Sequence, residues 1–275
     1  MSIEKLIRKE IIPLKPYAPG QTIADVQKKY KLLEVFNLST NESVLEPSSK
    51  VRDALKKELT TINQYPDGGS LELRKEIAQK YKVSSDMVIV TNGGDELLYL
   101  LTGCFISSGD EVILGEYGFS TYEIASTMYG AKIIKIPLKK GFLDLPTIAR
   151  QTNAKTKMIF LCNPYNPDGT IFTQQELEKF LENISDKIII VMDEAYIDFV
   201  ESKDFPNSIN LIKEKNNPIV SLRTFSKIGG IAGLRIGFGI AQPEFVNCLR
   251  KVQQPYSVNR LAQTAARACI NDNDY

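Results

Sequence analysis

Seven short apolar runs, each separated from the next by a longer polar or amphipathic segment, restrict the possible folds more than any other feature of the sequence. Runs of four to seven residues have the length of β-strands and are too short for most helices. Strands that are apolar along most of their length are typical of a mostly parallel sheet covered by helices on both faces. The sequence therefore predicts an α/β fold built on such a sheet. The runs lie at 87–90, 111–115, 132–136, 158–162, 188–192, 218–222 and 235–241.

The segments between these runs have the periodicity of amphipathic helices. One of them follows Thr173, and Glu176 stands three residues later. This spacing predicts a capping box at the start of a helix. We expect helices at 70–81, 96–106, 120–129 and 174–183.

The chain divides into three parts. Residues 46–250 hold the alternating pattern, and we predict that they form one large cofactor-binding domain. Residues 1–45 contain the proline-rich stretch IIPLKPYAPGQT, so we predict an extended N-terminal arm that also contributes part of a small domain. A helix is expected at 258–270, and residues 251–275 are expected to be the start of that small domain, which we expect to be truncated.

The charge balance argues against two classes of partner. Lys and Arg number 34 and Asp and Glu number 33, a net charge of +1. Proteins that bind nucleic acid or an anionic membrane surface usually carry an excess of basic residues. No apolar run approaches the ~20 residues of a membrane-spanning helix, and the charged start MSIEKLIRKE does not resemble a signal peptide. We therefore expect a cytoplasmic protein that binds neither nucleic acid nor membranes.

The sequence contains no histidine. This excludes catalysis by Ser-His and Cys-His pairs, and it excludes metal sites with histidine ligands. In an enzyme of this composition, lysine, tyrosine, carboxylates or a cofactor must carry the proton transfers. We expect no metal site.

Ligands of open parallel α/β sheets bind beyond the carboxyl ends of the strands, so polar residues directly after the apolar runs are candidates for a site. The first run is followed by TNGGDE, Thr91 to Glu96. Its two glycines allow backbone N–H groups to face a ligand at the start of the next helix, which is the form of a phosphate cradle. The alternative is a tight turn in which Asp95 caps the helix.

Two more candidates follow the fourth and fifth runs. In CNPYNPDG, a proline after Asn163 and another after Asn166 restrict the backbone and direct the Asn side chains, although a plain turn is also possible. In DEAY, Asp193 stands at the end of an apolar strand and Tyr196 stands three residues on. A carboxylate there is costly to bury unless it meets a cation or a donor. A helix-capping Asp is the alternative.

The sixth run is followed by TFSKIGG. A lysine at the mouth of a sheet, such as Lys227, can lose its proton and form a Schiff base with a carbonyl compound. The hydroxyls of Thr224 and Ser226 flank it and Arg235 follows, a set that suits a phosphate dianion. A P-loop is excluded because its GxxxxGK[ST] pattern is absent. Taken alone, a lysine such as Lys227 is more often a solvated surface residue.

Together these candidates match the requirements of one cofactor. Pyridoxal phosphate needs a lysine for its aldehyde, an acidic partner for its ring nitrogen, donors for its phenolic oxygen and a site for its phosphate. It needs no histidine. The four strand-end motifs therefore predict a pyridoxal-phosphate site.

Seven motifs in the same order carry a resemblance to a known family over nearly the whole chain. They are LKPYAPG, NES…EPSSKV, YPDGGSLELRKEIA, NGGDE, NPYNPDG, MDEAYIDF and TFSKIGGIAGLRIGFGIA. In these motifs the chain resembles the fold-type I pyridoxal-phosphate aminotransferases, and among them the histidinol-phosphate aminotransferases.

The resemblance implies a role for each cofactor residue. Lys227 is expected to bind the cofactor covalently, Asp193 to pair with the pyridine nitrogen, and Asn166 and Tyr196 to contact the ring oxygen. Phe119 falls where the family stacks an aromatic ring on the cofactor, although an ordinary core position would also explain it. Around the phosphate the resemblance places Gly94, Asp95, Glu96, Thr224, Ser226 and Arg235.

Three further residues concern the substrate and a second subunit. By resemblance, Tyr17 and Asn41 face the substrate, although Tyr17 could equally be a packing residue. Tyr65 matches a tyrosine that reaches the phosphate of the neighbouring subunit in the family. The resemblance thus implies a homodimer with shared active sites.

The activity implied by the resemblance is transamination between an amino acid or amino-alcohol phosphate, above all histidinol phosphate, and a 2-oxo acid such as 2-oxoglutarate. The Lys227 amine would remove the α-proton of the substrate. An aromatic aminotransferase, a phospho-amino-acid decarboxylase and an inactive cofactor-binding module are the alternatives. The family also carries a carboxylate-binding arginine beyond the helix at 258–270, which Arg260 and Arg267 do not match, so we expect this sequence to lack that anchor.

Overall fold

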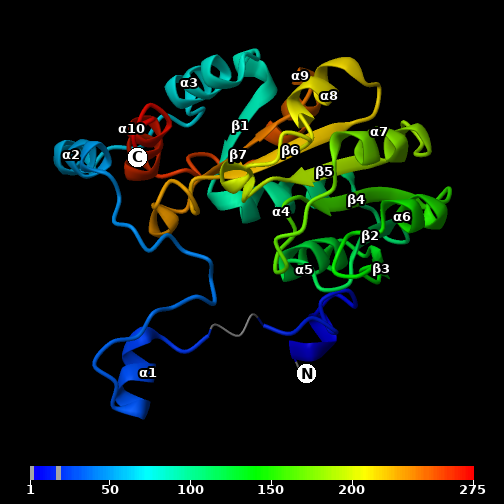
Figure 1. Ribbon diagram of the computed structural model, residues 1–275, viewed down its shortest axis with the longest axis horizontal. Coiled ribbons are helices and arrows are strands. Elements are labelled where there is room, and N and C mark those ends of the chain that lie inside the picture. The colour runs from blue at the N-terminus through cyan, green and yellow to red at the C-terminus, as the bar shows by residue number, and fades with distance from the viewer. Residues whose placement is uncertain (1–2, 17–19) are drawn as a thin grey trace.

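A seven-stranded sheet forms the centre of the computed structural model, which describes residues 3–16 and 20–275 (Figure 1). The strand order is β1-β7-β6-β5-β4-β2-β3, and every pair among β2 to β6 is parallel. The predicted α/β fold with a mostly parallel sheet is confirmed. The strands are β1 (Val88–Thr91), β2 (Glu111–Gly115), β3 (Lys132–Ile136), β4 (Thr156–Cys162), β5 (Ile189–Asp193), β6 (Ile219–Thr224) and β7 (Gly237–Ile240).

One strand runs against the others. Strand β7 pairs antiparallel with both β6 and β1. It follows β6 through a connection that contains only one short 3-10 turn, η5 (Ala232–Leu234). A parallel return needs a crossover of a dozen or more residues, usually with a helix. The connection, residues 225–236, has the length of the shortest crossovers but contains no α-helix to cover the sheet, and the chain turns back on itself.

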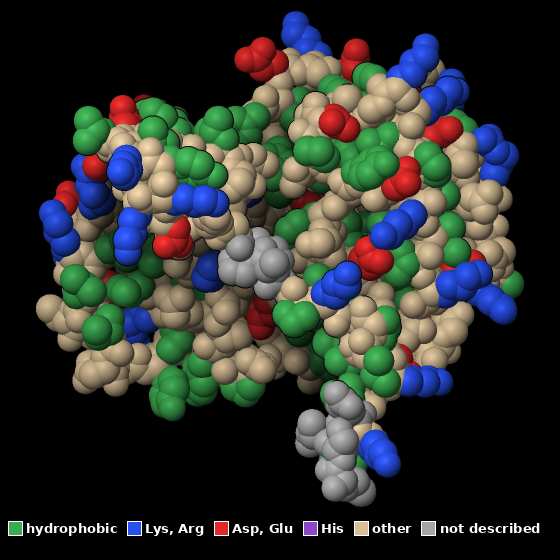
Figure 2. Space-filling model, turned by 90° about the horizontal axis from the view of Figure 1, so that it is seen from below, with side chains coloured by type: hydrophobic (Ala, Val, Ile, Leu, Met, Phe, Trp, Pro, Cys, Tyr) green, Lys and Arg blue, Asp and Glu red, His purple; other side chains and the backbone are tan. Residues whose placement is uncertain are grey.

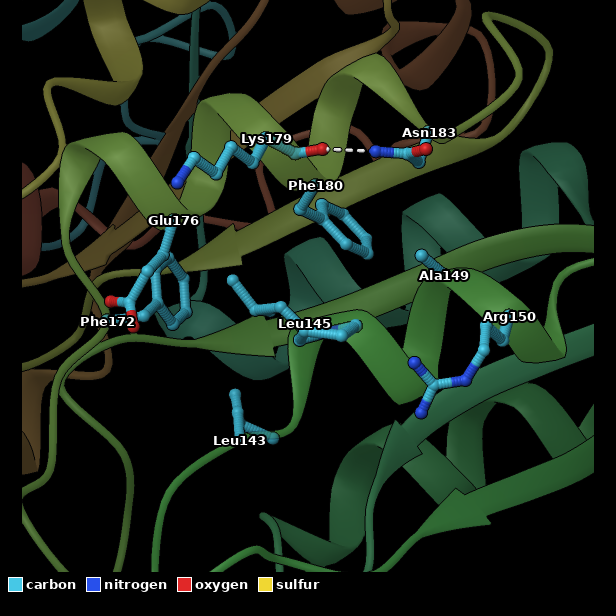
Figure 3. Close-up of a pocket in the computed structure, with 10 residues that line it drawn as sticks. Leu143, Leu145, Ala149, Arg150, Phe172, Glu176, Lys179, Phe180 and Asn183 are labelled. Carbon is cyan, nitrogen blue, oxygen red and sulfur yellow. Dashed lines mark hydrogen bonds between the residues drawn. The ribbon is translucent and has the colours of Figure 1, made fainter.

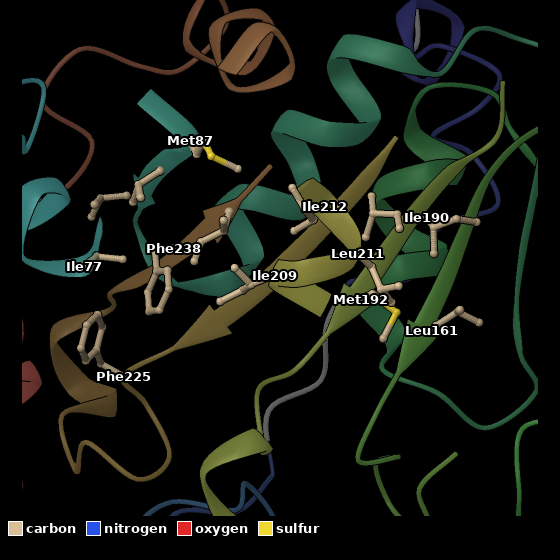
Figure 4. Close-up of a cluster of buried hydrophobic side chains, with 14 of the residues drawn as sticks. Ile77, Met87, Leu161, Ile190, Met192, Ile209, Leu211, Ile212, Phe225 and Phe238 are labelled. Carbon is tan, nitrogen blue, oxygen red and sulfur yellow. The ribbon is translucent and has the colours of Figure 1, made fainter. Parts of the chain in front are cut away.

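Successive side chains of each strand enter different hydrophobic clusters, because neighbouring residues of a strand point to opposite faces. In β5, Ile190 and Met192 belong to the larger cluster, whereas Ile189 and Val191 belong to the smaller one. Figure 4 shows part of the larger cluster, in which α8 side chains lie over the strands. Both faces of the sheet are thus buried, as the unbroken apolar runs require.

The helices divide between the two faces of the sheet. One set buries residues in the larger cluster and the other set in the smaller cluster. The first set is α2 (Ser49–Glu58), α3 (Leu71–Tyr81), α6 (Leu145–Gln151), α7 (Gln174–Glu182), α8 (Ser208–Glu214) and α10 (Arg260–Ile270), and the second is α4 (Gly93–Phe105), α5 (Ser120–Met128) and α9 (Pro243–Arg250). The remaining 3-10 turns are η1 (Ile3–Leu6), η2 (Leu59–Thr61), η3 (Ser85–Met87) and η4 (Ile197–Phe199).

The predicted helix at 174–183 begins with the expected capping box. The Thr173 backbone N–H donates to Glu176 Oε2 at 2.7 Å, and the Glu176 N–H donates to Thr173 Oγ1 at 3.3 Å. This satisfies two N–H groups that a helix start leaves without partners. The other predicted helices start and end within three residues of α3, α4, α5 and α10.

We predicted an extended N-terminal arm, but the described part of the arm contains a helix. Helix α1 (Ile23–Tyr30) begins at a capping box made by Thr22 and Asp25, and it buries none of its residues. It lies apart from the helices that flank the sheet (Figure 1). Apolar side chains of the arm, such as Leu33 and Phe36, are exposed. Figure 2, which views the molecule from below, shows apolar side chains among charged ones on that face of the surface. The domain limits at 45 and 250 stay a prediction.

We searched the described helices for one that could cross a membrane. Across residues 3–16 and 20–275, none of the helices combines the length and the apolar character that crossing a bilayer requires.

Ile190→Ala should lower the free energy of unfolding by about 2–5 kcal/mol, because the side chain is completely buried in β5 and its removal leaves a cavity. Ile190→Val should cost only about 0.5–1.5 kcal/mol. Urea unfolding followed by circular dichroism measures both. Ile62→Ala, at a residue that is 58% exposed, is the control and should change stability by less than about 0.5 kcal/mol. Similar losses at both positions would contradict this account of the core.

Candidate active site

The carboxyl ends of β5 and β6 and the first turn of α4 surround a cavity of about 490 Å³. Asp193, the last residue of β5, lies beside Leu222 of β6 in the parallel register. The polar residues that follow the two strands are therefore delivered to the same edge of the sheet. Of the residues predicted from the sequence, the cavity is lined by Asn41, Gly94, Asp95, Phe119, Asn166, Asp193, Tyr196, Thr224, Ser226, Lys227 and Arg235.

Lys227 stands at the mouth of this cavity. Its Nζ donates to the backbone carbonyl of Thr40 at 2.8 Å and lies 5.6 Å from the centre of the Tyr196 ring. Burial lowers the pKa of the amine, Glu42 partly offsets this shift, and Arg235 adds to the lowering. A lowered pKa increases the fraction of neutral amine, which is the form that acts as a nucleophile or base.

Asp193 is a buried carboxylate, only 6% exposed. Its Oδ1 accepts from the Ala195 backbone N–H at 3.0 Å, and its Oδ2 accepts from the Tyr122 hydroxyl. Burial raises the pKa of this carboxyl, the two hydrogen bonds oppose the rise, and the carboxylates of Glu194 and Asp95 add to it. Within the described part of the chain no Lys or Arg forms an ion pair with it. The site therefore favours a positively charged ligand group at this point.

Arg235 and the start of α4 also line the cavity and form an anion-binding arrangement. Arg235 Nη2 lies 3.1 Å from Asp95 Oδ2. Gly93 has φ +75°, a conformation that strains other residues, and a Cβ at this position would lie 2.6 Å from Arg235 Nη2, so a side chain here would also displace the guanidinium. The N-cap Asn92 makes no side-chain hydrogen bond to the helix. Free N–H groups, the helix dipole and the guanidinium together favour a phosphate.

A short segment of the N-terminal arm covers the cavity. Residues 39–42 all line it, and Asn41 Nδ2 donates to the Tyr196 hydroxyl at 3.0 Å. With the bond from Lys227 to Thr40, this gives the segment two polar contacts with the site. Of these four residues, sequence reasoning identified only Asn41.

Two predicted site residues do not line the cavity, and a third falls outside the residues that the structure describes. The Glu96 carboxylate accepts from the Asn92 backbone N–H and from Ser257 Oγ at 3.2 Å, so it points along the helix start and does not line the cavity. Tyr65 is 78% exposed, stacks on Tyr256 with ring centres 4.8 Å apart, and does not line the cavity of its own chain. Tyr17 lies outside the described residues.

Tyr122 is the most important residue that sequence reasoning missed. It is buried, lines the cavity and donates to Asp193. Its ring stacks on Phe160 with centres 4.7 Å apart and meets the edge of Phe119 at 5.7 Å. Its place three residues after Phe119 was the available signal, since residues i and i+3 share a face of a helix. Cys162 and Leu222 also line the cavity.

The residues present fit pyridoxal phosphate. The cavity offers an amine with a lowered pKa, a buried carboxylate that pairs with no Lys or Arg of the described residues, and an arginine that lies against a glycine of positive φ. These match the cofactor's aldehyde, ring nitrogen and phosphate. The donor set therefore supports the cofactor expected from the sequence.

A second cavity, of about 510 Å³, lies between α6 and α7, and its charged lining residues Arg150, Glu176 and Lys179 are exposed, unlike the buried Asp193 (Figure 3). Its walls include the apolar side chains of Leu145, Phe172 and Phe180. The hydrogen bond drawn there, from Asn183 Nδ2 to the Lys179 carbonyl at 2.7 Å, serves the end of α7. We therefore place the candidate active site at the strand ends.

Comparisons with known proteins identify the family to which the chain is similar. A family model described as aminotransferase class I and II matches residues 34–275. The chain is 41% identical to histidinol-phosphate aminotransferase 2 of Carboxydothermus hydrogenoformans, over 98% of this chain and 75% of that protein. It is 39% identical to the histidinol-phosphate aminotransferase of Moorella thermoacetica, over 96% and 69%.

A solved structure shows the same fold. The histidinol-phosphate aminotransferase from Sinorhizobium meliloti, in complex with pyridoxal-5'-phosphate, superposes with a TM-score of 0.89 at 23% identity. The match covers 98% of this chain and 72% of that one. At 23% sequence identity, this structural similarity is evidence for a shared fold only.

Asp193→Asn should stabilise the cofactor-free protein, and the gain should grow as pH rises. Because the native pKa of Asp193 lies above its ordinary value of 3.8, the native state binds more protons than the unfolded state between the two values. Stability then falls as pH rises through this window and stays low above it. Asparagine does not titrate, and urea unfolding of both proteins from pH 4 to pH 7 measures the difference.

Asp144→Asn is a control variant that should change the free energy of unfolding in the opposite direction. The Thr147 hydroxyl and the Thr147 backbone N–H lower the pKa of Asp144, the N-cap of α6. Its contribution to stability is present above the ordinary pKa and is lost as pH falls through the native pKa. Asp144→Asn should therefore be increasingly destabilising towards neutral pH. A stability difference at Asp193 that does not vary with pH would contradict the burial argument.

Proposed function

Because the chain belongs to the family of class I and II aminotransferases, we propose that it uses pyridoxal phosphate to transfer the amino group of histidinol phosphate to a 2-oxo acid such as 2-oxoglutarate. One observation carries the proposal: Lys227, Asp193 and Arg235 meet in a single cavity at the carboxyl edge of the sheet. The relatives at 41% and 39% identity, both named histidinol-phosphate aminotransferases, support this choice of substrate.

The cofactor-binding roles follow from the chemistry of each side chain. Arg235, with the hydroxyls of Thr224 and Ser226 and the open N-terminus of α4, would bind the phosphate dianion. Asp193 would hold the ring nitrogen in its charged form, which also provides the cation that this buried carboxylate lacks. Tyr122 and the Ala195 N–H would keep the carboxylate oriented.

Asn166 and Tyr196 also line the cavity. The Asn166 side chain and the Tyr196 hydroxyl would serve as hydrogen-bond partners for the phenolic oxygen of the cofactor. Asn41 holds the Tyr196 hydroxyl in place. Phe119 and Tyr122 would present aromatic surface to the ring.

Lys227 would both bind the cofactor covalently and move the proton at the substrate Cα. When bound, the cofactor supplies an electron sink for the charge left on that carbon. The lowered pKa of Lys227 makes its neutral, proton-accepting form accessible. The contact of Nζ with the Thr40 carbonyl orients the amine towards the arm segment 39–42, where the substrate would enter.

The proposal includes a homodimer with shared sites. Tyr65 is highly exposed and does not line the cavity of its own chain. Its hydroxyl is thus available to the phosphate site of a second copy. We place this enzyme in the cytoplasm.

Lys227→Ala should abolish amino transfer while leaving the fold intact, because the side chain lies at the edge of the cavity and not in the core. Borohydride reduction of the protein loaded with pyridoxal phosphate, followed by peptide mass spectrometry, should find the cofactor attached to Lys227 and to no peptide of the variant. Turnover is measured with histidinol phosphate and with aromatic amino acids as donors. Attachment at another lysine, or transfer by the variant, would rule out this assignment.

Tyr65→Phe chains paired with Lys227→Ala chains should regain about half of the wild-type activity per dimer. In such a mixed dimer, Lys227 of one chain and Tyr65 of the other rebuild one complete site, and the second site carries both changes. Dimers with two different affinity tags are purified in two steps and assayed against each parent variant. Zero activity in mixed dimers that are shown to form would argue against shared sites.

A further inference from the structure

A buried ion pair lies directly behind the candidate active site. Glu194 follows Asp193, and Arg223 precedes Thr224. Because alternate residues of a strand point to opposite faces, Asp193, Leu222 and Thr224 face the cavity. Glu194 and Arg223 do not line it.

The contacts within this pair are dense. Arg223 Nε and Nη2 each lie 2.9 Å from Glu194 Oε2, and Ser221 Oγ donates to the same oxygen at 2.6 Å. The Arg223 guanidinium lies 4.6 Å from the centre of the Tyr81 ring. Glu194 is 0% exposed and Arg223 is 8% exposed. Burial is the largest single influence and acts to lower the pKa of Arg223, but Glu194 and Tyr81 together outweigh it and the pKa is raised, so the guanidinium stays charged.

Stability alone is a poor explanation for this pair. Removing two charges from water costs more than their attraction usually returns, and apolar pairs of similar volume are often equally stable or better. In addition, Glu194 Oε1 has no hydrogen-bond partner among the residues that the structure describes. A buried carboxylate oxygen without a donor adds to the cost.

The pair joins the two strands that carry the reactive side chains. The Glu194 N–H donates to the Leu222 carbonyl at 2.9 Å, and the Asp193 carbonyl accepts from the Asn163 N–H at 2.9 Å. These bonds extend the sheet by one residue past its regular end. The ion pair then fixes the side chain of Glu194 to Arg223, so the peptide between residues 193 and 194 cannot rotate freely.

We propose that the Glu194–Arg223 ion pair is a positioning device that holds the Asp193 carboxylate and the segment leading to Lys227 in the geometry that the cofactor needs. This inference rests on the proposed function of the cavity. It assigns Glu194, Arg223 and Ser221 a role that acts through Asp193 and Lys227, without contact with the cofactor.

A double variant separates positioning from simple packing. Glu194→Met combined with Arg223→Met removes both charges together and leaves no unpaired ion, so the melting temperature should stay within about 5 °C of the wild type. Its dissociation constant for pyridoxal phosphate, measured by equilibrium dialysis, should rise about 10-fold or more, the size of effect seen when the outer partners of metal ligands are lost. The pH midpoint of the visible absorbance of the bound cofactor should shift as well.

Arg223→Lys provides a second test that does not depend on the double variant folding. Lysine keeps the charge but cannot place two nitrogens on Glu194 Oε2. It should weaken cofactor binding in the same direction and shift the same pH midpoint. If either variant folds and binds the cofactor with the wild-type constant and pH midpoint, the pair is a packing feature and the proposal is wrong.

Glu111→Gln is the matched control. Glu111 is also buried, at 7% exposure, and pairs with Lys132 at 3.0 Å and Asn153 at 2.7 Å. It lies at the amino end of β2, the opposite end of the strands from the cavity. The change should lower stability and leave the cofactor dissociation constant unaltered. A wild-type protein that binds no pyridoxal phosphate would overturn the proposed function itself, and this inference with it.

Discussion

The parallel pairing of β5 with β6 is the constraint on which the rest of the site depends. Asp193 and Leu222 lie side by side in that register, so the residues after the two strands emerge at one edge of the sheet. The carboxylate comes from the end of one strand and the lysine from the segment after the other. Little loop is needed to bring them together, and a rigid hydrogen-bonded ladder sets their separation.

Because side chains alternate between the two faces, the ends of β5 and β6 contribute residues both to the cavity and to a buried ion pair. One face of the sheet presents Asp193 and Thr224 to the cavity, and the other face buries Glu194 and Arg223. Charged groups on both faces of a sheet end are unusual, since each must be desolvated. They leave the strand ends little freedom to adapt, which suits a cavity that must hold a small ring at several points at once.

The strands and most helices were predictable because burial on both faces requires unbroken apolar runs, and the location of the site followed from the parallel sheet. Other features depend on packing that no local pattern encodes. An apolar run does not indicate direction, so the reversal of β7 was not visible. Tyr122 reaches Asp193 only because α5 packs on the sheet. Glu96 belongs to the right motif, but it bonds the Asn92 N–H and so stays outside the cavity.

The burial of Asp193 has a consequence for the lifetime of the protein in a cell. This carboxylate, which pairs with no Lys or Arg in the described part of the chain, weakens the empty fold. A ligand that binds only the native state adds RT ln(1 + [L]/Kd), about 2.7 kcal/mol at a hundredfold excess over Kd. Chains that have not acquired their ligand therefore unfold more often and are exposed to proteases more often. The supply of ligand then governs how much of this protein accumulates as well as how much of it is active.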